Sequence, residues 1–467
     1  MSSRNKDLLI FFFSLAGALI VPAISGLEYT TVPGTLLAAN RVMWLKFMGQ
    51  PYAFSVLENA KPLLSFILGV FGIESLNIIS PAACAVIVLM FCRLTQRCGA
   101  SAIEGVAASA FFFFCNGIVL YDMVFFNGNI IYLAILFSAV TLFIEGHRRI
   151  PAGLLFLAGL WRPETWLLSG LFCIWQAVKR QFKPIYLISL LAPVCWMFFD
   201  RRISGDWFYS SRQITQFCRI SGFNPITITQ FPAVVVFFFR HYYGVLLSII
   251  GFFGLILFSL RYRRGLLMPL IVTGIIPLFF YGFAALVSPS LFFYPRFFTP
   301  ILLVTALGAA LVPCCVTSRR LVRAAVLMGL ILVFLRVDAL QPLYARVQKD
   351  QIRKNAVNAV FSYFDSYLKV HKLTGKIALS DIPDTFSLRY GPEFSRHAIT
   401  VRQIGSDLTL LKDVDLWVAI PSGEGYNASN TRLTFLYKAG EHRIGNTVFK
   451  PVYVHDLFII YKLDRAG

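Results

Sequence analysis

The chain has 467 residues, of which 57% are hydrophobic, and its mean hydropathy of +0.69 is too high for a soluble globular protein. A net charge of +20 would suit nucleic acid, but much of the excess lies in short turns between apolar segments, where anionic lipid headgroups are the natural partner. Composition therefore indicates a polytopic membrane protein and argues against a nucleic-acid partner.

Apolar segments bounded by charged residues, glycine or proline mark the expected transmembrane helices. Because about 20 apolar residues are needed to cross ~30 Å of hydrocarbon, the sequence predicts roughly eleven crossings by the hydropathy rule. They are expected near 8–25, 78–95, 102–120, 128–145, 152–162, 164–178, 184–199, 239–260, 266–287, 297–314 and 321–337.

Every second gap between these segments is basic. The basic groups are Arg4/Lys6, Arg93/Arg97, Arg148/Arg149, Lys179/Arg180/Lys183, Arg261/Arg263/Arg264 and Arg319/Arg320/Arg323. Since cytoplasmic turns carry an excess of Lys and Arg, the N-terminus and these turns are expected in the cytoplasm. The other gaps, together with everything beyond residue 340, then face outward, and a functional site is expected there.

The segments 152–162 and 164–178 are both short for a membrane crossing. They flank residues 161–164, whose sequence is WRPE. Pro163 cannot continue a helix, and a charged Arg162 is costly against lipid unless it is paired or faces water. The sequence therefore predicts a broken helix whose tip stops in the outer half of the membrane and faces a cavity.

Two outward segments, 26–77 and 201–237, mix apolar and polar residues. In the first, apolar residues recur at helical spacing over 36–47 and again over 63–73, which predicts helices lying in the membrane interface. The second segment is expected to form a gate.

Beyond residue 340 charged residues become frequent, and about 125 residues suffice for one small domain. Short apolar or alternating runs at 376–380, 415–420, 432–437 and 457–461 indicate strands. The predicted fold class is thus a polytopic α-helical membrane module, 1–340, followed by an extracytoplasmic α/β domain, 341–467.

Two outward carboxylates are candidates for acid–base chemistry. Glu28 follows the first span, where partial desolvation suits a carboxylate for general-base work on a hydroxyl; a solvated Glu at a helix end is the alternative. Asp122 lies in the next outward turn and could supply a second acid or a metal ligand, or could simply end a helix.

Outward cations are candidates for binding a lipid phosphate. Arg296 stands before a span, and its planar guanidinium can bind phosphate oxygens in pairs; snorkelling to lipid headgroups is the alternative. Arg162 could bind the same phosphate, or could pair with Glu164 and brace the broken helix. The remaining candidates are Lys61, Arg212 and His241, with Pro163 and Tyr294 as supporting residues.

The chain has no Walker or dinucleotide glycine loop, no His-x-x-x-His pair and no Gly-x-Ser-x-Gly elbow. Soluble nucleotide donors are therefore disfavoured. A site that opens outward needs an activated substrate already carried across the membrane, and a lipid-linked donor meets that need.

These features together resemble the GT-C superfamily of membrane glycosyltransferases, over most of 1–340. The resemblance is carried by Glu28 after the first span, Lys61-Pro62 in the outer segment, Asp122 in the second outward turn, the stretch 160–164, and the stretch 294–300. The outward C-terminal domain is similar to that of bacterial members.

The resemblance implies an inverting transfer of a sugar from a polyprenyl phosphate to an acceptor hydroxyl of a lipid, glycan or protein, in cell-envelope assembly. Glu28 would accept the hydroxyl proton, and Arg296, supported by Arg162 or Lys61, would stabilise the departing phosphate. A divalent ion such as Mg²⁺ or Mn²⁺ at Asp122 is compatible with this scheme, although cations alone could suffice. A bacterial inner membrane, with the site facing the periplasm, is the expected location.

Two other functions remain open at this point. A transporter or flippase of a lipid-linked glycan would also use outward cations and broken helices, but it predicts inverted repeats, which the sequence lacks. A non-catalytic protein of glycan assembly would bind through its C-terminal domain.

Overall fold

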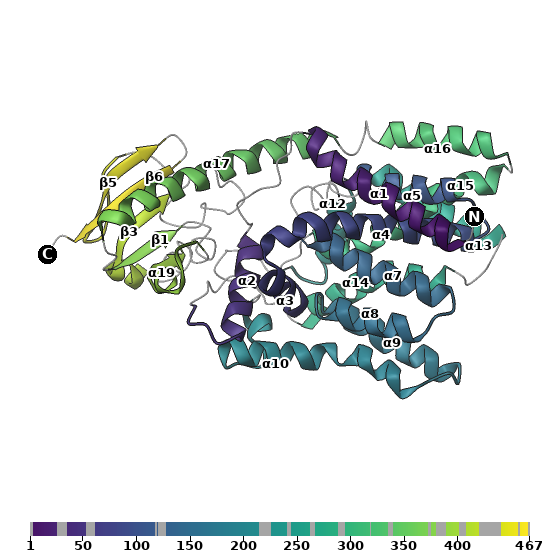
Figure 1. Ribbon diagram of the computed structural model, residues 1–467, viewed down its shortest axis with the longest axis horizontal. Helices are drawn as coiled ribbons and strands as arrows, with labels where there is room; N and C mark the ends of the chain where they lie inside the picture. Colours follow the sequence, from purple (N-terminus) through teal and green to yellow (C-terminus); the bar gives the residue numbers. More distant parts are fainter. Residues whose placement is uncertain are drawn as a thin grey trace.

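The computed structural model describes residues 3–25, 35–52, 61–116, 119, 128–213, 226–240, 244–261, 267–287, 295–317, 319–334, 340–371, 375–379, 389–400, 408–419, 440–455 and 458–465. Most of them are helical, and a six-stranded sheet lies near the C-terminus. In Figure 1 the N-terminus and the sheet lie at opposite ends of the long axis.

The helices before residue 340 form one bundle (Figure 1). They are α1 (Ser3–Ser25), α2 (Thr35–Phe47), α3 (Pro62–Phe71), η1 (Ile73–Ser75), α4 (Leu76–Arg97), α5 (Ala102–Phe114), α7 (Asn129–Ile144), α8 (Arg149–Gly159), α9 (Glu164–Val178), η2 (Pro184–Leu190), α10 (Ala192–Ser204), α12 (Phe231–Phe238), α13 (Val245–Arg261), α14 (Met268–Val287), η4 (Pro295–Phe298), α15 (Pro300–Val316) and α16 (Arg320–Phe334).

Each predicted span overlaps a helix or, at 184–199, the bent pair of η2 and α10, but eleven crossings are not confirmed. Within the described residues, Ile73–Arg97 and Met268–Val287 are each long and apolar enough to cross a membrane, and η2 with α10, bent by 43°, makes a third candidate. The other apolar helices are shorter; the 17 residues of α15 reach about 25 Å at 1.5 Å per residue. The predicted spans included apolar residues that lie beyond the proline, glycine or charged residue at which a helix ends.

The two helices expected in the first outward segment are present as α2 and α3. α2 packs on α10 through Met43, which clusters with Phe199, Ile203 and Tyr209. The second outward segment, 201–237, includes the end of α10 and most of α12. Its predicted role as a gate stays a prediction.

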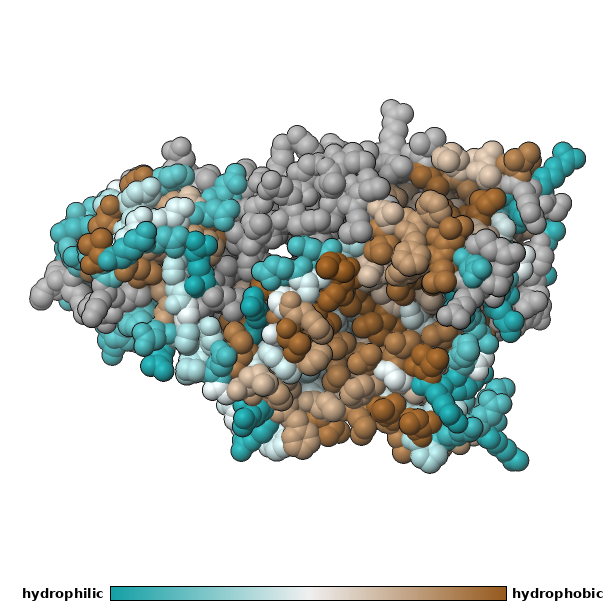
Figure 2. Space-filling view, in the orientation of Figure 1, coloured by the Kyte–Doolittle hydropathy of each residue, from teal (hydrophilic) through white to brown (hydrophobic). Residues whose placement is uncertain are grey.

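The surface of the bundle is strongly apolar. Figure 2 shows hydrophobic residues in a broad area over the helices and hydrophilic residues over the sheet. Large side chains such as Phe13, Ile78 and Phe283 are about 70% exposed, at 71%, 72% and 67%. An apolar area this extensive is unfavourable against water, so the surface agrees with a protein that has membrane-spanning helices.

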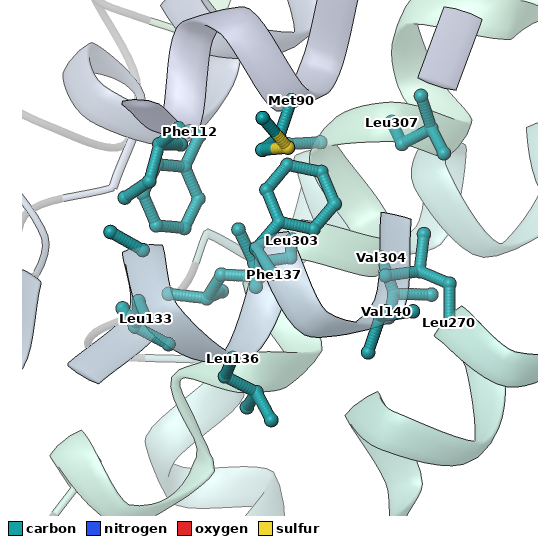
Figure 3. Close-up of a cluster of buried hydrophobic side chains, with 14 of the residues drawn as sticks. Met90, Phe112, Leu133, Leu136, Phe137, Val140, Leu270, Leu303, Val304 and Leu307 are labelled. Atoms are coloured by element: carbon teal, nitrogen blue, oxygen red, sulfur yellow. The ribbon is translucent and has the colours of Figure 1, made fainter. Parts of the chain in front are cut away.

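The bundle core is built where α4, α5, α7, α14 and α15 meet (Figure 3). The rings of Phe91 and Phe137 lie 4.6 Å apart at its centre. Beside it, α13 and α15 approach closely, because a Cβ added at Gly251 would lie 2.2 Å from the Thr305 carbonyl oxygen. Small residues that allow such backbone contact are typical of helix packing in membranes.

The basic turns that the structure describes lie at the bundle end opposite the sheet (Figure 1), and two of their arginines pair with acids there. Arg93 of α4 binds Glu145, with a shortest N–O distance of 2.5 Å, and Arg323 of α16 lies 3.0 Å from Glu104 of α5. Each pair joins two helices. The described basic turns thus share one end, as predicted, while Arg263 and Arg264 lie outside the described residues. The assignment of that end to the cytoplasm stays a prediction.

The C-terminal region begins with the long helix α17 (Leu340–Val370) and continues into a mixed sheet of order β2-β1-β3-β6-β5-β4. β1 pairs in parallel with β2 and β3, and the remaining pairs are antiparallel. The elements after α17 are β1 (Lys376–Leu379), α19 (Pro392–His397), β2 (Ala398–Thr400), η6 (Leu408–Asp413), β3 (Val414–Ala419), β4 (His442–Ile444), β5 (Thr447–His455) and β6 (Phe458–Arg465).

Alternate residues of the central strands face opposite sides of this sheet. Leu416 and Val418 pack against α17 through Val360 and Phe364, while Trp417 packs on the other side with the neighbouring strands. The strands predicted at 376–380, 415–420 and 457–461 are confirmed as β1, β3 and β6. The one predicted at 432–437 lies outside the described residues.

Candidate functional site at the helix break

The predicted helix break is present, and a tight turn joins α8 to α9. α8 ends at Gly159 and α9 begins at Glu164, with Pro163 at the N-cap position. Proline suits this place because the first N–H groups of a helix have no intrahelical acceptor. The Trp166 indole donates to the Gly159 carbonyl at 2.9 Å and closes the turn. With 11 residues, α8 extends only about 16 Å.

Arg162 and Glu164 form a buried ion pair at the tip of this turn. Arg162 Nη1 lies 3.2 Å from Glu164 Oε1, and the two side chains are 6% and 1% exposed. Arg162 Nη2 donates to Asn129 Oδ1 at 2.6 Å. Burying two charges is favourable only when hydrogen bonds complete the pair, and Asn129, the first residue of α7, supplies one of them.

Neutral groups from three other elements surround the pair. Tyr281 of α14 donates its hydroxyl proton to Glu164 Oε2 at 3.0 Å, and Asn129 Nδ2 donates to the Thr299 hydroxyl at 3.2 Å. The guanidinium also lies 4.9 Å from the Tyr132 ring centroid and 5.7 Å from that of Phe297. Apart from Glu164, the groups that hold the cation in a fixed orientation are therefore neutral.

The segment that carries Arg296 comes to the same place. η4 spans Pro295–Phe298, and its Phe297 ring stacks on Tyr281 at 4.8 Å with an interplanar angle of 9°. Because Phe297 also faces the Arg162 guanidinium, the backbone of Arg296 is one residue from the buried cluster. The side chain of Arg296 lies outside the described part of the chain.

The backbone of Lys61 also lies beside the helix break. Its N–H donates to Asn40 Oδ1 of α2 at 3.0 Å, and the N–H of Leu63 donates to the Leu160 carbonyl at 3.3 Å. The start of α3 is therefore fixed against the end of α8. Gly128 faces this turn with φ +70°, and a Cβ there would lie 2.8 Å from the Trp161 ring, so glycine is required on both counts.

Other predicted site residues are elsewhere or are not described. Arg212 is 71% exposed and pairs with Asp206 at 3.2 Å, and it is not among the described residues that contact Arg162. The carboxylates Glu28 and Asp122, together with Tyr294 and His241, lie outside the described residues. The structure thus brings together Lys61, Arg162, Pro163, Glu164 and the backbone of Arg296.

Sequence reasoning gave no site role to the neutral members of the cluster. Asn129, Tyr132, Tyr281 and Thr299 are all buried and contact the pair or its partners. Their only signal in the sequence was a polar group within or beside an apolar segment, since a buried polar group needs a partner.

A search for metal-binding groups finds no set of three or more His, Cys, Asp or Glu side chains in the part of the chain that the structure describes. The acid expected to bind a divalent ion, Asp122, is outside that part.

A scan against models of known protein families gives no match, and a search of curated proteins finds no relative of this chain.

Proposed function

We propose that the chain is a membrane glycosyltransferase that moves a sugar from a polyprenyl phosphate to an acceptor hydroxyl, at the bundle end that carries the helix break. The observation that carries the proposal is the meeting of the starts of α3, α7 and α9 with η4 at one buried, charged cluster. Residues expected to bind phosphate stand just before two of these elements, Lys61 before α3 and Arg162 before α9, and Arg296 lies within η4.

In this scheme the buried pair positions other groups. Arg162 is already engaged by Glu164 and Asn129, so its main contribution is to hold η4 and the start of α7 at fixed distances. Arg296, next to Phe297, then supplies the guanidinium for the donor phosphate. A preorganised cation costs no reorganisation when charge develops on the leaving group.

The proposed chemical step is an in-line displacement at the anomeric carbon. Glu28 accepts the proton of the acceptor hydroxyl, and the oxygen forms a bond to the anomeric carbon of the sugar. The bond from that carbon to the phosphate oxygen breaks, and the polyprenyl phosphate leaves with the electron pair. Arg296 stabilises the charge that this adds to the phosphate.

The site's depth suits a lipid-borne substrate. The tip of the short helix α8 is about 16 Å from its basic end, which is about half of a ~30 Å hydrocarbon layer. A phosphate carried on a lipid can reach a charged cluster at that level without leaving the membrane. A soluble donor would have to enter an apolar surface.

The test is an assay of purified protein in lipid vesicles with a radiolabelled polyprenyl-phosphate sugar and a panel of acceptor hydroxyl compounds. The proposal expects the label to become covalently attached to an acceptor. Movement of intact donor between leaflets without product would favour a transporter, and retention of donor without either would favour a binding protein. Either of these outcomes overturns the proposal.

A further inference from the structure

A second lipid-facing feature lies at the other end of the bundle, between α7, α8, α9 and α14 (Figure 1). It is a groove of about 130 Å³, and its walls include Phe143, Leu155, Phe172 and Trp175. It is separate from the helix break, because α8 and α9 run from that break back to the basic turns.

The groove offers its occupant almost no hydrogen bonds. Among its described walls only Thr273 and Trp175 carry a polar side-chain atom, and the Thr273 hydroxyl donates to the Pro269 carbonyl at 2.8 Å. Apolar cavities of roughly 150 Å³ stay dry and accept hydrocarbon, so this groove fits a stretch of one acyl chain. Leu171 and Trp175 on its rim are 40% and 48% exposed, which opens it to the surrounding lipid.

Two cationic side chains lie over aromatic rings that line the groove. The Arg148 guanidinium carbon lies 4.6 Å from the centroid of Phe143, and Lys179 Nζ lies 5.3 Å from that of Trp175. The ring centroids of Phe143 and Phe172 are 5.5 Å apart, so the end of α7 packs against α9. The mouth of the groove therefore has a positive charge on each of two walls.

No acid among the described residues neutralises these cations. Neither Arg148 nor Lys179 forms an ion pair there, and Arg148 donates to the carbonyls of Phe143 and His147. The nearby acid, Glu145, is held by two hydrogen bonds from Arg93 at 2.8 and 2.5 Å. An occupant with hydrocarbon at one end and negative charge at the other satisfies both parts of the site.

We propose that this groove binds an anionic phospholipid of the membrane, with an acyl chain in the groove and the phosphate between Arg148 and Lys179. Juxtamembrane cations favour anionic headgroups by roughly fivefold each. The preference over a zwitterionic lipid is therefore expected to be about twenty-five-fold when both act. This site is independent of the proposed sugar transfer.

Trp175 provides the measurement, because it lines the groove. Full-length protein is placed in phosphatidylcholine bilayers that contain a small fraction of phosphatidylglycerol brominated on its acyl chains, and quenching of tryptophan fluorescence is recorded. The part of the quenching that Trp175→Phe removes comes from lipid in the groove. This Trp175-dependent quenching is expected to be larger with brominated phosphatidylglycerol than with an equal fraction of brominated phosphatidylcholine.

Replacing both cations, Arg148→Gln with Lys179→Gln, should abolish that preference. Lys179→Gln alone, at an exposed position, should lower it about fivefold. A matched pair, Arg97→Gln with Arg319→Gln, removes the same charge from exposed positions at the same end and should leave the preference intact. An equal loss in the matched pair, no preference in the original protein, or stronger competition by polyprenyl phosphate than by phosphatidylglycerol would each overturn the proposal.

Discussion

The two ends of the helical bundle use ion pairs in opposite ways. At the basic end, two acids meet cations from other helices: Arg93 binds Glu145, and Arg323 binds Glu104. At the helix break, Arg162 and Glu164 are two residues apart on one turn, and the groups that reach them from other helices are neutral. A pair between helices joins them directly, whereas a pair within one turn joins other elements only through the neutral groups that contact it. The local pair therefore serves to place a charge inside the bundle, and Asn129 and Tyr281 fix its position.

The largest expected effect comes from removing the acid at the helix break. Glu164→Gln leaves the Arg162 guanidinium charged in a site where it is 6% exposed, and breaking such a pair costs roughly 3–5 kcal/mol. Denaturant unfolding in detergent, monitored by tryptophan fluorescence, measures the loss.

The matched double replacement separates the cost of an unpaired charge from the cost of altered shape. Arg162→Met together with Glu164→Leu removes both charges, and it should be less destabilising than Glu164→Gln alone. If the double replacement loses more stability than the single one, the side-chain contacts of the pair matter more than the neutralisation of one charge by the other.

A smaller effect is expected at the basic end. The Arg93 and Glu145 side chains are 29% and 15% exposed, so solvent screens them more than the pair at the break. Arg93→Gln should cost about 1 kcal/mol or less in the same unfolding measurement. A cost equal to that of Glu164→Gln would remove the distinction between the two ends.

The smallest effect is expected outside the bundle, at Asp365 of α17. The Arg389 guanidinium donates to its carboxylate at 2.6 Å and, with Tyr390, lowers the pKa of Asp365 from its usual range. A lowered folded-state pKa adds stability above the unfolded value of about 4, and this is lost as the pH falls through the folded value. Because both partners are at least 40% exposed, the contribution is a fraction of about 1 kcal/mol.

Hydrogen exchange in β1 and β3 detects this contribution when the original protein and Asp365→Asn are compared at each pH. Protection should be higher in the original protein near pH 6, and the difference should shrink as the pH falls below the unfolded-state value of about 4. A difference that grows as the pH falls would contradict the direction of the pKa shift.

Much of the fold could be predicted from the sequence because its signals are local. Runs of apolar residues located the helices, and Pro163 between two charges located the break. β5 was not predicted, since Pro451 interrupts it and the pairing with β6 shifts register between Pro451 and Tyr453; proline is ordinarily a sign against a strand. β2 has three residues and depends on its pairing with β1.

The candidate site was less predictable because its contacts are remote in sequence. Arg162 and Glu164 are neighbours, and their pairing was one of the two readings of the WRPE stretch. Tyr281 reaches Glu164 across 117 positions, and Asn129 reaches Thr299 across 170. Nothing in the local pattern of either segment indicates such a partner, since polar residues inside apolar helices can be satisfied in many ways.

The most direct test of sugar transfer compares Glu28→Gln with Glu74→Gln, a matched change at an exposed acid of the same outward segment. Donor binding and covalent transfer are measured side by side with a radiolabelled polyprenyl-phosphate sugar. Glu28→Gln should bind donor like the original protein and transfer none of it, because the amide cannot accept the hydroxyl proton, while Glu74→Gln should do both. Transfer by Glu28→Gln at the original rate would contradict the role of Glu28 as the base.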